Sequence, residues 1–130
     1  MNETELFKAT MEIATQLPAT KEGRFVDEWS EVRVGDKWFV LTTVHESRLV
    51  NLKAEPLDVE TLTETYPFIT RGYHMNKKHW ISVYPHEDLT YEFLEDLIKN
   101  SYALVVSGLP KKKRPISEET LLQLLRTQSR

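Results

Sequence analysis

The chain has 130 residues, enough for one domain with a buried core, and its 40% hydrophobic and 28% charged residues are typical of globular proteins. Cysteine is absent, which excludes disulfides, thiol catalysis and thiolate metal sites. No apolar run approaches the roughly 18 residues that a membrane span requires, and the acidic N-terminus lacks the layout of a signal peptide. We therefore expect a soluble, cytoplasmic protein.

Basic residues are concentrated in two stretches. Residues 68–86 contain three basic residues and no acid, and residues 99–116 contain five basic residues and no acid. Because the net charge is −3, the remaining chain carries −11. Such segregation creates a local positive field that the net charge hides. The alternative is that two solvated basic runs are separated from acidic helices by chance.

Four segments show the apolar spacing and end signals of helices. Asn2 and Glu5 form a capping-box pattern at the start of the first, and Ser117 is a cap residue before the last. The expected helices cover residues 2–17, the segment between Pro56 and Pro67, the segment from about Thr90 to Gly108, and the residues that follow Ser117.

Five strands are expected between these helices. Gly35-Asp36 separates two β-rich runs and is a two-residue hairpin signal of the Gly-first kind. Pairing residue 34 with 37 places Arg33 opposite Trp38, at cation–π distance, and Val32 opposite Phe39. The face of this hairpin that is expected to meet the core holds Val32, Val34, Phe39 and Leu41. A third strand is expected over 48–54, and two more in 68–85, around a turn at 75–78.

The order α-βββ-α-ββ-α-α predicts an α+β two-layer sandwich, with an antiparallel sheet of about five strands and helices on one face. No repeat or linker divides the chain, so residues 1–130 are expected to form one domain.

The stretch "GYHMNKKHW", residues 72–80, is the densest cluster of chemically active side chains. The expected turn pairs His74 with His79, and Tyr73 with Trp80. Two histidines are an incomplete zinc set; His45, Glu46 or His86 would have to complete it, and no metal-ligand spacing is present. The histidines are therefore expected to be a packed or hydrogen-bonded cross-strand pair, with no metal.

No catalytic constellation is present. Ser47, Ser82, Ser101 and Ser107 lack a nucleophile-elbow context, and no Gly-rich loop is available to hold phosphates. We expect a protein that is not an enzyme and needs no cofactor.

The same stretch also fits a basic hairpin tip. Lysines bind phosphate as point charges, and Asn, Tyr and Trp side chains add contacts to sugar and base. Lysines also populate exposed turns simply to keep a sheet edge soluble. Residue types and spacing alone leave both interpretations open.

Three stretches occur in the order that is typical of one family. "GDKWFVL…VNLKAEP", "GYHMNKKHW" and "SYALVVSGLPKKKR" together closely resemble the MmcQ/YjbR family of small bacterial proteins, from about Lys37 to Arg114. The resemblance implies a fold like that of CyaY or the type III secretion chaperones. It also implies a DNA-binding role with a double-wing arrangement, and it makes 115–130 a family-variable C-terminal helix.

The resemblance places one wing at Gly35-Asp36 and the other at Asn76-Lys77. Double-stranded DNA is then the expected partner, although Glu31, Asp36 and Glu46 lie near the first wing, where they would repel phosphate. The expected nucleic-acid contacts are Lys37, Arg71, His74, Asn76, Lys77, Lys78, His79, Lys111, Lys112 and Lys113. The alternative is a protein-interaction or homodimer surface made by aromatic residues on the outer sheet face, namely Trp38, Tyr73, Trp80 and Tyr84.

Overall fold

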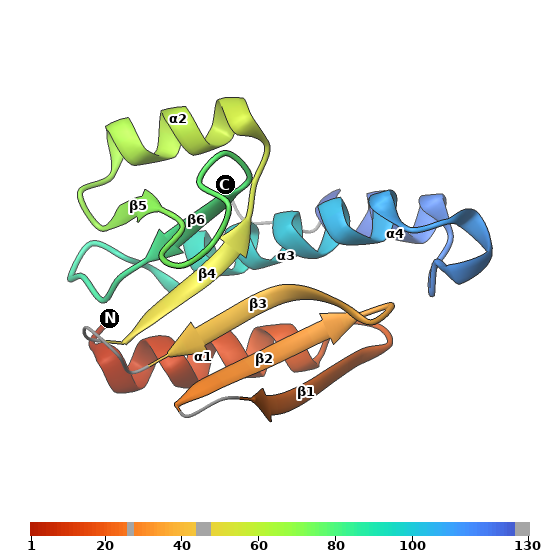
Figure 1. Ribbon diagram of the computed structural model, residues 1–130, viewed down its shortest axis with the longest axis horizontal. Coiled ribbons are helices and arrows are strands. Elements are labelled where there is room, and N and C mark those ends of the chain that lie inside the picture. Colours follow the sequence, from red (N-terminus) through yellow and green to blue (C-terminus); the bar gives the residue numbers. More distant parts are fainter. Residues whose placement is uncertain (26–27, 44–47, 127–130) are drawn as a thin grey trace.

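A six-stranded antiparallel sheet in the order β1-β2-β3-β4-β6-β5 forms the frame of the protein (Figure 1). The computed structural model describes residues 1–25, 28–43 and 48–126. The elements are α1 (Glu3–Thr15), β1 (Thr20–Phe25), β2 (Trp29–Val34), β3 (Lys37–Thr43), β4 (Leu49–Lys53), α2 (Pro56–Thr65), β5 (Ile69–Arg71), β6 (Trp80–Val83), α3 (Tyr91–Gly108), the 3-10 helix η1 (Lys111–Lys113) and α4 (Glu118–Arg126).

Helices cover one face of this sheet, as expected for the α+β class. Helices α1 and α3 pack behind strands β1 to β4, α2 packs against β5 and β6, and α4 packs on α3 (Figure 1). The other face, which we call the outer face, carries no helix among the described residues (Figure 1).

The four predicted helices are confirmed, and side-chain caps explain the starts of three of them, whereas α2 begins at Pro56 without one. The Asn2 side chain accepts a hydrogen bond from the Glu5 N–H at 2.8 Å, and the Glu5 carboxylate accepts one from the Asn2 N–H at 2.9 Å. Thr90 caps α3 through the Phe93 N–H, at 3.1 Å, and Ser117 accepts from the Thr120 N–H at 3.1 Å. Such caps satisfy backbone donors that have no partner within the helix.

The predicted hairpin at Gly35-Asp36 forms, but its geometry differs in two respects. Both turn residues have left-handed backbones, with φ of 56° at Gly35 and 62° at Asp36, so the turn is of type I′ rather than the Gly-first type. Arg33 pairs with Trp38 as predicted, but a β-bulge follows, and Val32 lies opposite Val40 instead of Phe39.

The bulge changes which residues reach the core. One extra residue in β3 reverses the alternation of the strand, so Phe39 and Val40 both enter the core, where Phe39 meets Tyr102 edge to face at 5.3 Å. Leu41 is buried, as predicted, but not on the core face: it pairs with Asn51 and lines a hollow on the outer face.

Strand β1 was not predicted. Its sequence, "TKEGRF", lacks alternating apolar residues, and it forms an edge of the sheet beside β2. Charged side chains are common on edge strands, where they discourage pairing with other chains.

Among the described residues no helix combines the length and the apolar character that crossing a bilayer requires. The cytoplasmic location stays a prediction.

Tyr102 should make the stability of the fold sensitive to alkaline pH. Its hydroxyl donates to the Pro18 carbonyl at 2.6 Å, and burial raises its pKa from 10.0 to about 12. The folded state therefore favours the neutral phenol. The contribution of this phenol to the free energy of unfolding is complete below pH 10 and is lost as the pH rises toward 12. We expect Tyr102→Phe to cost about 1 kcal/mol at pH 8, and to show a smaller loss of unfolding free energy between pH 8 and 11 than the wild type, measured by urea denaturation. Equal losses in both proteins would contradict this assignment.

Candidate functional site

The segment 72–79 folds back over the outer face instead of projecting as a hairpin tip. Strand β5 ends at Arg71, which pairs with Ile81, and the Gly72 N–H donates to the Trp80 carbonyl at 2.9 Å. The turn lies one residue later than predicted, at Asn76–His79, where the His79 N–H donates to the Asn76 carbonyl at 3.2 Å. The predicted His74–His79 and Tyr73–Trp80 pairs were wrong, because Gly72 rather than Tyr73 lies opposite Trp80. His74 has a left-handed backbone with φ of 58°, and its ring lies against that of Tyr73, 4.1 Å between centroids.

A buried polar network attaches this segment to the sheet. Asn51 of β4 and Ser82 of β6 are fully buried neighbours, and the Ser82 hydroxyl donates to Asn51 Oδ1. Asn51 Nδ2 donates to the Tyr73 carbonyl at 2.9 Å, and the Tyr73 N–H donates to Ser82 Oγ at 2.7 Å. Both backbone groups of Tyr73 are thus satisfied by side chains of the sheet, which positions the basic residues that follow.

The basic residues of this segment are ordered by their own backbone contacts. Lys77 donates from Nζ to the Gly72 carbonyl at 2.6 Å, and Arg71 Nη1 donates to the Lys77 carbonyl at 3.2 Å. Asn76 Oδ1 accepts from the Lys78 N–H at 2.9 Å, so Asn76 shapes the turn. The exposed side chains of Arg71, Lys77 and Lys78 thus remain at the surface as a cluster of positive charge.

At the other end of the outer face, Trp38 is held by a charged pair. Arg33 and Glu31 form a two-point ion pair, with Nε to Oε2 at 2.7 Å and Nη2 to Oε1 at 3.1 Å. Trp38 donates its indole N–H to Glu31 Oε1 at 2.9 Å, and the Arg33 guanidinium lies 5.1 Å from the indole centroid. The cation–π contact inferred from the sequence is therefore present.

The same contacts change the charge balance of this region. Hydrogen bonds from Arg33 and from the Trp38 indole hold the pKa of Glu31 below its usual value. Glu31 is therefore ionised, and its charge is directed at Arg33 rather than at the open surface.

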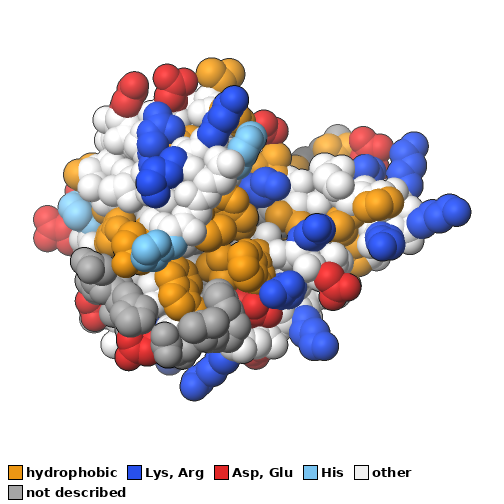
Figure 2. All heavy atoms as spheres, viewed as in Figure 1, with side chains coloured by type: hydrophobic (Ala, Val, Ile, Leu, Met, Phe, Trp, Pro, Cys, Tyr) orange, Lys and Arg blue, Asp and Glu red, His pale blue; other side chains and the backbone are white. Residues whose placement is uncertain are grey.

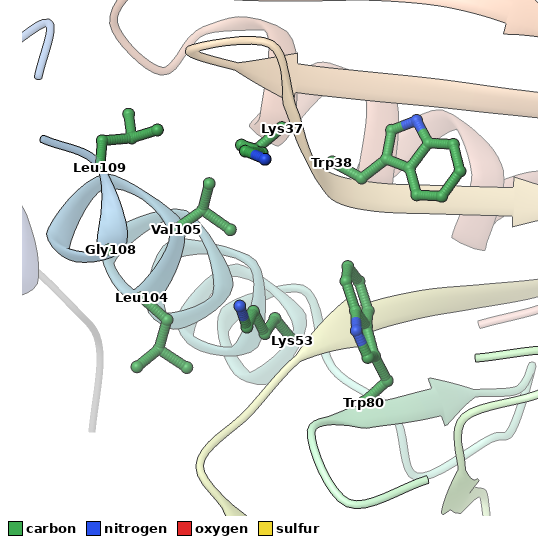
Figure 3. Close-up of a pocket in the computed structure, with 8 residues that line it drawn as sticks. All are labelled: Lys37, Trp38, Lys53, Trp80, Leu104, Val105, Gly108 and Leu109. Carbon is green, nitrogen blue, oxygen red and sulfur yellow. The ribbon is translucent and has the colours of Figure 1, made fainter. Parts of the chain in front are cut away.

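A cleft of about 310 Å³ opens on the outer face beside Trp38 (Figure 3). It is lined by Lys37, Trp38, Lys53, Trp80, Leu104, Val105, Gly108 and Leu109. The side chains from β3 lie on one side, those of Lys53 and Trp80 on the other, and the last turns of α3 form the apolar wall (Figure 3). Of the described residues that line it, two are lysines and none is acidic.

The cleft exists because strands β3 and β4 part at Ser101. The Ser101 hydroxyl, fully buried on α3, donates to the Phe39 carbonyl at 2.7 Å and accepts from the Lys53 N–H at 2.8 Å. The Ser101 hydroxyl thereby takes the place of a direct backbone hydrogen bond between β3 and β4. The side chains of Lys37 and Lys53 consequently stand on opposite sides of an opening that α3 closes from behind (Figure 3).

A smaller hollow, of about 200 Å³, lies on the far side of Trp38. It is lined by Trp29, Trp38, Leu41, His74 and Met75. Trp29 stacks on Tyr73 at a centroid distance of 6.4 Å, so the segment 72–79 supplies part of this wall. Trp38 thus contributes to both cavities.

Lys and Arg side chains surround this apolar centre. Figure 2 shows them gathered over the β5–β6 connection and toward the end that carries η1, whereas most of the visible Asp and Glu lie at the rim. Lys111, Lys112 and Lys113 are exposed on η1. Arg114 turns back and donates to the carbonyls of Leu109, at 2.9 Å, and Ser107, at 2.8 Å, which offsets the negative end of the α3 dipole.

The remaining predicted residues are dispersed. His79 is half-buried, and its carbonyl accepts from the Ala54 N–H at 3.0 Å. Tyr84 is half-buried just after β6. Within the described ranges, no three His, Asp or Glu side chains come together as a metal site. His45 and Glu46, considered as additional ligands, lie outside the described residues.

Sequence reasoning singled out Lys37, Trp38 and Trp80 but missed Lys53 and the α3 wall of the cleft. Lys53 is the lysine of the Asn-Leu-Lys strand that carries part of the family resemblance, and this was its only signal in the sequence. Leu104 is only partly buried and lines the opening.

The fold is shared with two proteins of known structure. A crystal structure of the Deinococcus radiodurans protein DR2400, with a DUF419 domain, superposes with a TM-score of 0.76 at 30% identity, covering 92% of this chain and 91% of that one. A Pseudomonas syringae protein gives a TM-score of 0.63 at 26% identity, covering 80% of this chain and 98% of that one.

The YjbR family model matches residues 15–104, and the chain belongs to this family. Uncharacterized protein YbdF of Escherichia coli O157:H7 is 39% identical over 114 residues, which cover 86% of this chain and 93% of YbdF. Uncharacterized protein YjbR of Escherichia coli K12 is 30% identical, covering 69% of this chain and 79% of YjbR. These matches confirm the resemblance that was seen in the sequence motifs.

Proposed function

We propose that this protein binds DNA through the outer face of its sheet, without catalysing a reaction. The observation that carries the proposal is the gathering of basic side chains around an acid-free cleft on a face that no described helix covers (Figure 2). Phosphate contacts account for much of the affinity of DNA-binding proteins, and lysine and arginine supply them. The negative net charge does not oppose this, because most visible acids lie at the rim of this face (Figure 2).

Two positions of the proposed interface correspond to the wings that the family resemblance implies. Lys37 follows the turn between β2 and β3, and Lys77 and Lys78 lie on the segment 72–79. The arrangement of these three lysines favours DNA contacts that are spread over the outer face, rather than contacts made by two projecting hairpin tips. The residues proposed to contact phosphate are Lys37, Lys53, Arg71, Lys77, Lys78, Lys111, Lys112 and Lys113.

A protein partner is the second candidate, and one observation favours it. Trp38 and Trp80 are only partly buried and line an open cleft, and aromatic residues are enriched in protein interfaces. A linear fall of log affinity with log salt on duplex DNA supports the first candidate, because each neutralised phosphate releases counterions.

The proposal predicts a change in salt dependence when exposed lysines are removed. We expect the wild type to bind a labelled 20-base-pair duplex with an affinity that falls steeply with salt. In Lys78→Gln/Lys112→Gln, the slope of log affinity against log salt should be smaller by roughly 2, because each lost phosphate contact removes about 0.9. Fluorescence anisotropy at several salt concentrations measures the slope for the wild type and for the double variant.

The matched control is Lys8→Gln/Arg24→Gln, which removes the same charge from exposed residues on α1 and on the edge strand β1. It should keep the wild-type slope. An equal reduction in both double variants would show that only the overall charge matters, and absence of duplex binding at low salt would overturn the proposal.

A further inference from the structure

We infer that the cleft between Trp38 and Trp80 binds one unpaired nucleotide, with the base against the indole rings and the phosphate at Lys37 and Lys53. The inference rests on the proposed function and deepens it, because it names the part of a nucleic acid that this site selects. A base within a regular duplex is stacked on both sides and offers only its edges. A site that stacks a base on an indole therefore requires a base that has left the stack.

Trp38 is already ordered for such stacking before a ligand arrives. Its indole N–H is bound to Glu31 at 2.9 Å, and Arg33 lies 5.1 Å from the ring centroid. The ring thus has its polar atom satisfied and its orientation fixed, while it still lines the cleft (Figure 3). Ordering a side chain in advance removes part of the entropic cost of binding.

Trp80 presents a second indole from the opposite side of the same opening (Figure 3). Its position is fixed by the backbone around it: the Trp80 carbonyl accepts from the Gly72 N–H at 2.9 Å, and Trp80 pairs with Lys53 across β6 and β4. The wall of Leu104, Val105 and Leu109 faces these rings and excludes water from one side (Figure 3). An aromatic body between apolar walls is the ligand that such a cleft accommodates.

The charges of the cleft select an anion. Lys37 and Lys53 come from facing strands, and no described lining residue is acidic. The end of α3, which would repel an anion, is offset by the guanidinium of Arg114 on the carbonyls of Ser107 and Leu109. The combination of two ammonium groups with two indoles is the pattern that single-stranded nucleic-acid sites use.

The size of the cleft limits the ligand to a single unit. At about 310 Å³ it lies at the lower end of the range for small-molecule sites, roughly 300–1,000 Å³. One nucleotide fits this volume and a base pair with its neighbours does not. The exposed lysines of η1, which follow the α3 wall directly, could contact the flanking phosphates.

The test compares three labelled DNA duplexes of equal length by fluorescence anisotropy at one salt concentration. The first is fully paired, the second carries one unpaired adenine at its centre, and the third carries an abasic residue in place of that adenine. We expect the second to bind about tenfold more tightly than the first or the third, which corresponds to the stacking of one base. Equal affinity for the second and third duplexes would overturn the inference.

Two variants assign any such preference to the cleft. Trp80→Leu should abolish the tenfold preference, and Lys37→Gln/Lys53→Gln should weaken binding of the unpaired duplex more than binding of the paired one. The lysine variant keeps the inference testable if Trp80→Leu fails to fold, since both ammonium groups lie on a cleft that is open to solvent. The Lys8→Gln/Arg24→Gln control should keep the preference. A preference that is undiminished in the lysine variant would contradict the assignment.

Competition with free deoxyadenosine monophosphate distinguishes two sources of the same ligand. Displacement of the unpaired duplex by the free nucleotide would show that the cleft binds a nucleotide whether or not it belongs to a DNA strand, whereas resistance to displacement would assign the site to an unpaired strand.

Duplex binding with the expected salt slope but no gain from the unpaired base would overturn this inference and leave the proposed function standing. Absence of binding to all three duplexes would overturn both.

Discussion

Replacing Ser101 by alanine is expected to lower the free energy of unfolding by about 3 kcal/mol, because two buried backbone groups lose their partners at once. The serine hydroxyl now satisfies the Phe39 carbonyl and the Lys53 N–H, at 2.7 and 2.8 Å, and it is fully buried. For a domain of this size the change corresponds to a melting temperature lower by about 10 °C. Urea denaturation followed by circular dichroism measures the difference.

The control for this prediction is Ser107→Ala, six residues further along the same helix. The Ser107 side chain is exposed, so its removal should change stability by less than about 0.5 kcal/mol. A loss below about 1 kcal/mol in Ser101→Ala would show that the two strands can close on each other when the serine is absent. In that case the cleft would depend on other contacts than the ones described.

Adding a methyl group at Gly72 is expected to be the second severe change, with a cost of about 3 kcal/mol from overpacking. A Cβ atom at this position would lie 2.7 Å from Trp80 Cβ and 2.9 Å from Met75 Cβ, and the Trp80 backbone, at 3.3 Å, leaves little room to adjust. The segment 72–79 would have to lift from the sheet, which would disturb both Trp80 and the Tyr73 hydrogen bonds.

Gly108→Ala is the matched control, because a Cβ atom there meets nothing within 4 Å. Since alanine favours helices more than glycine does, we expect Gly108→Ala to be neutral or stabilising by about 0.5–1 kcal/mol. Thermal denaturation of the two variants measures the contrast directly. Equal stability of both would mean that segment 72–79 adapts without cost.

Features encoded locally could be predicted from the sequence. The caps at Asn2, Thr90 and Ser117 act within three residues, so the helix starts were visible. The two-residue turn at Gly35-Asp36 acts over a similar range and set the pairing of Arg33 with Trp38. The sheet and its helical cover followed from these elements and their order.

Features that depend on distant contacts could not be predicted in this way. Segment 72–79 looked like a hairpin tip because nothing in its own residues shows that Asn51 and Ser82 bind Tyr73. The bulge at Phe39 is stabilised by core packing rather than by a local signal. The cleft likewise joins Lys37, Lys53 and Leu104, which are far apart in the sequence, so only part of the site was recognised.

The placement of tryptophan gives this protein a built-in optical reporter. All three tryptophans of the chain, Trp29, Trp38 and Trp80, are partly buried and line the two cavities of the outer face. Tryptophan emission therefore arises from this face alone, because the core below it, with Phe39 and Tyr102, contains no tryptophan. A ligand that occupies either cavity should therefore change the emission spectrum without any attached dye.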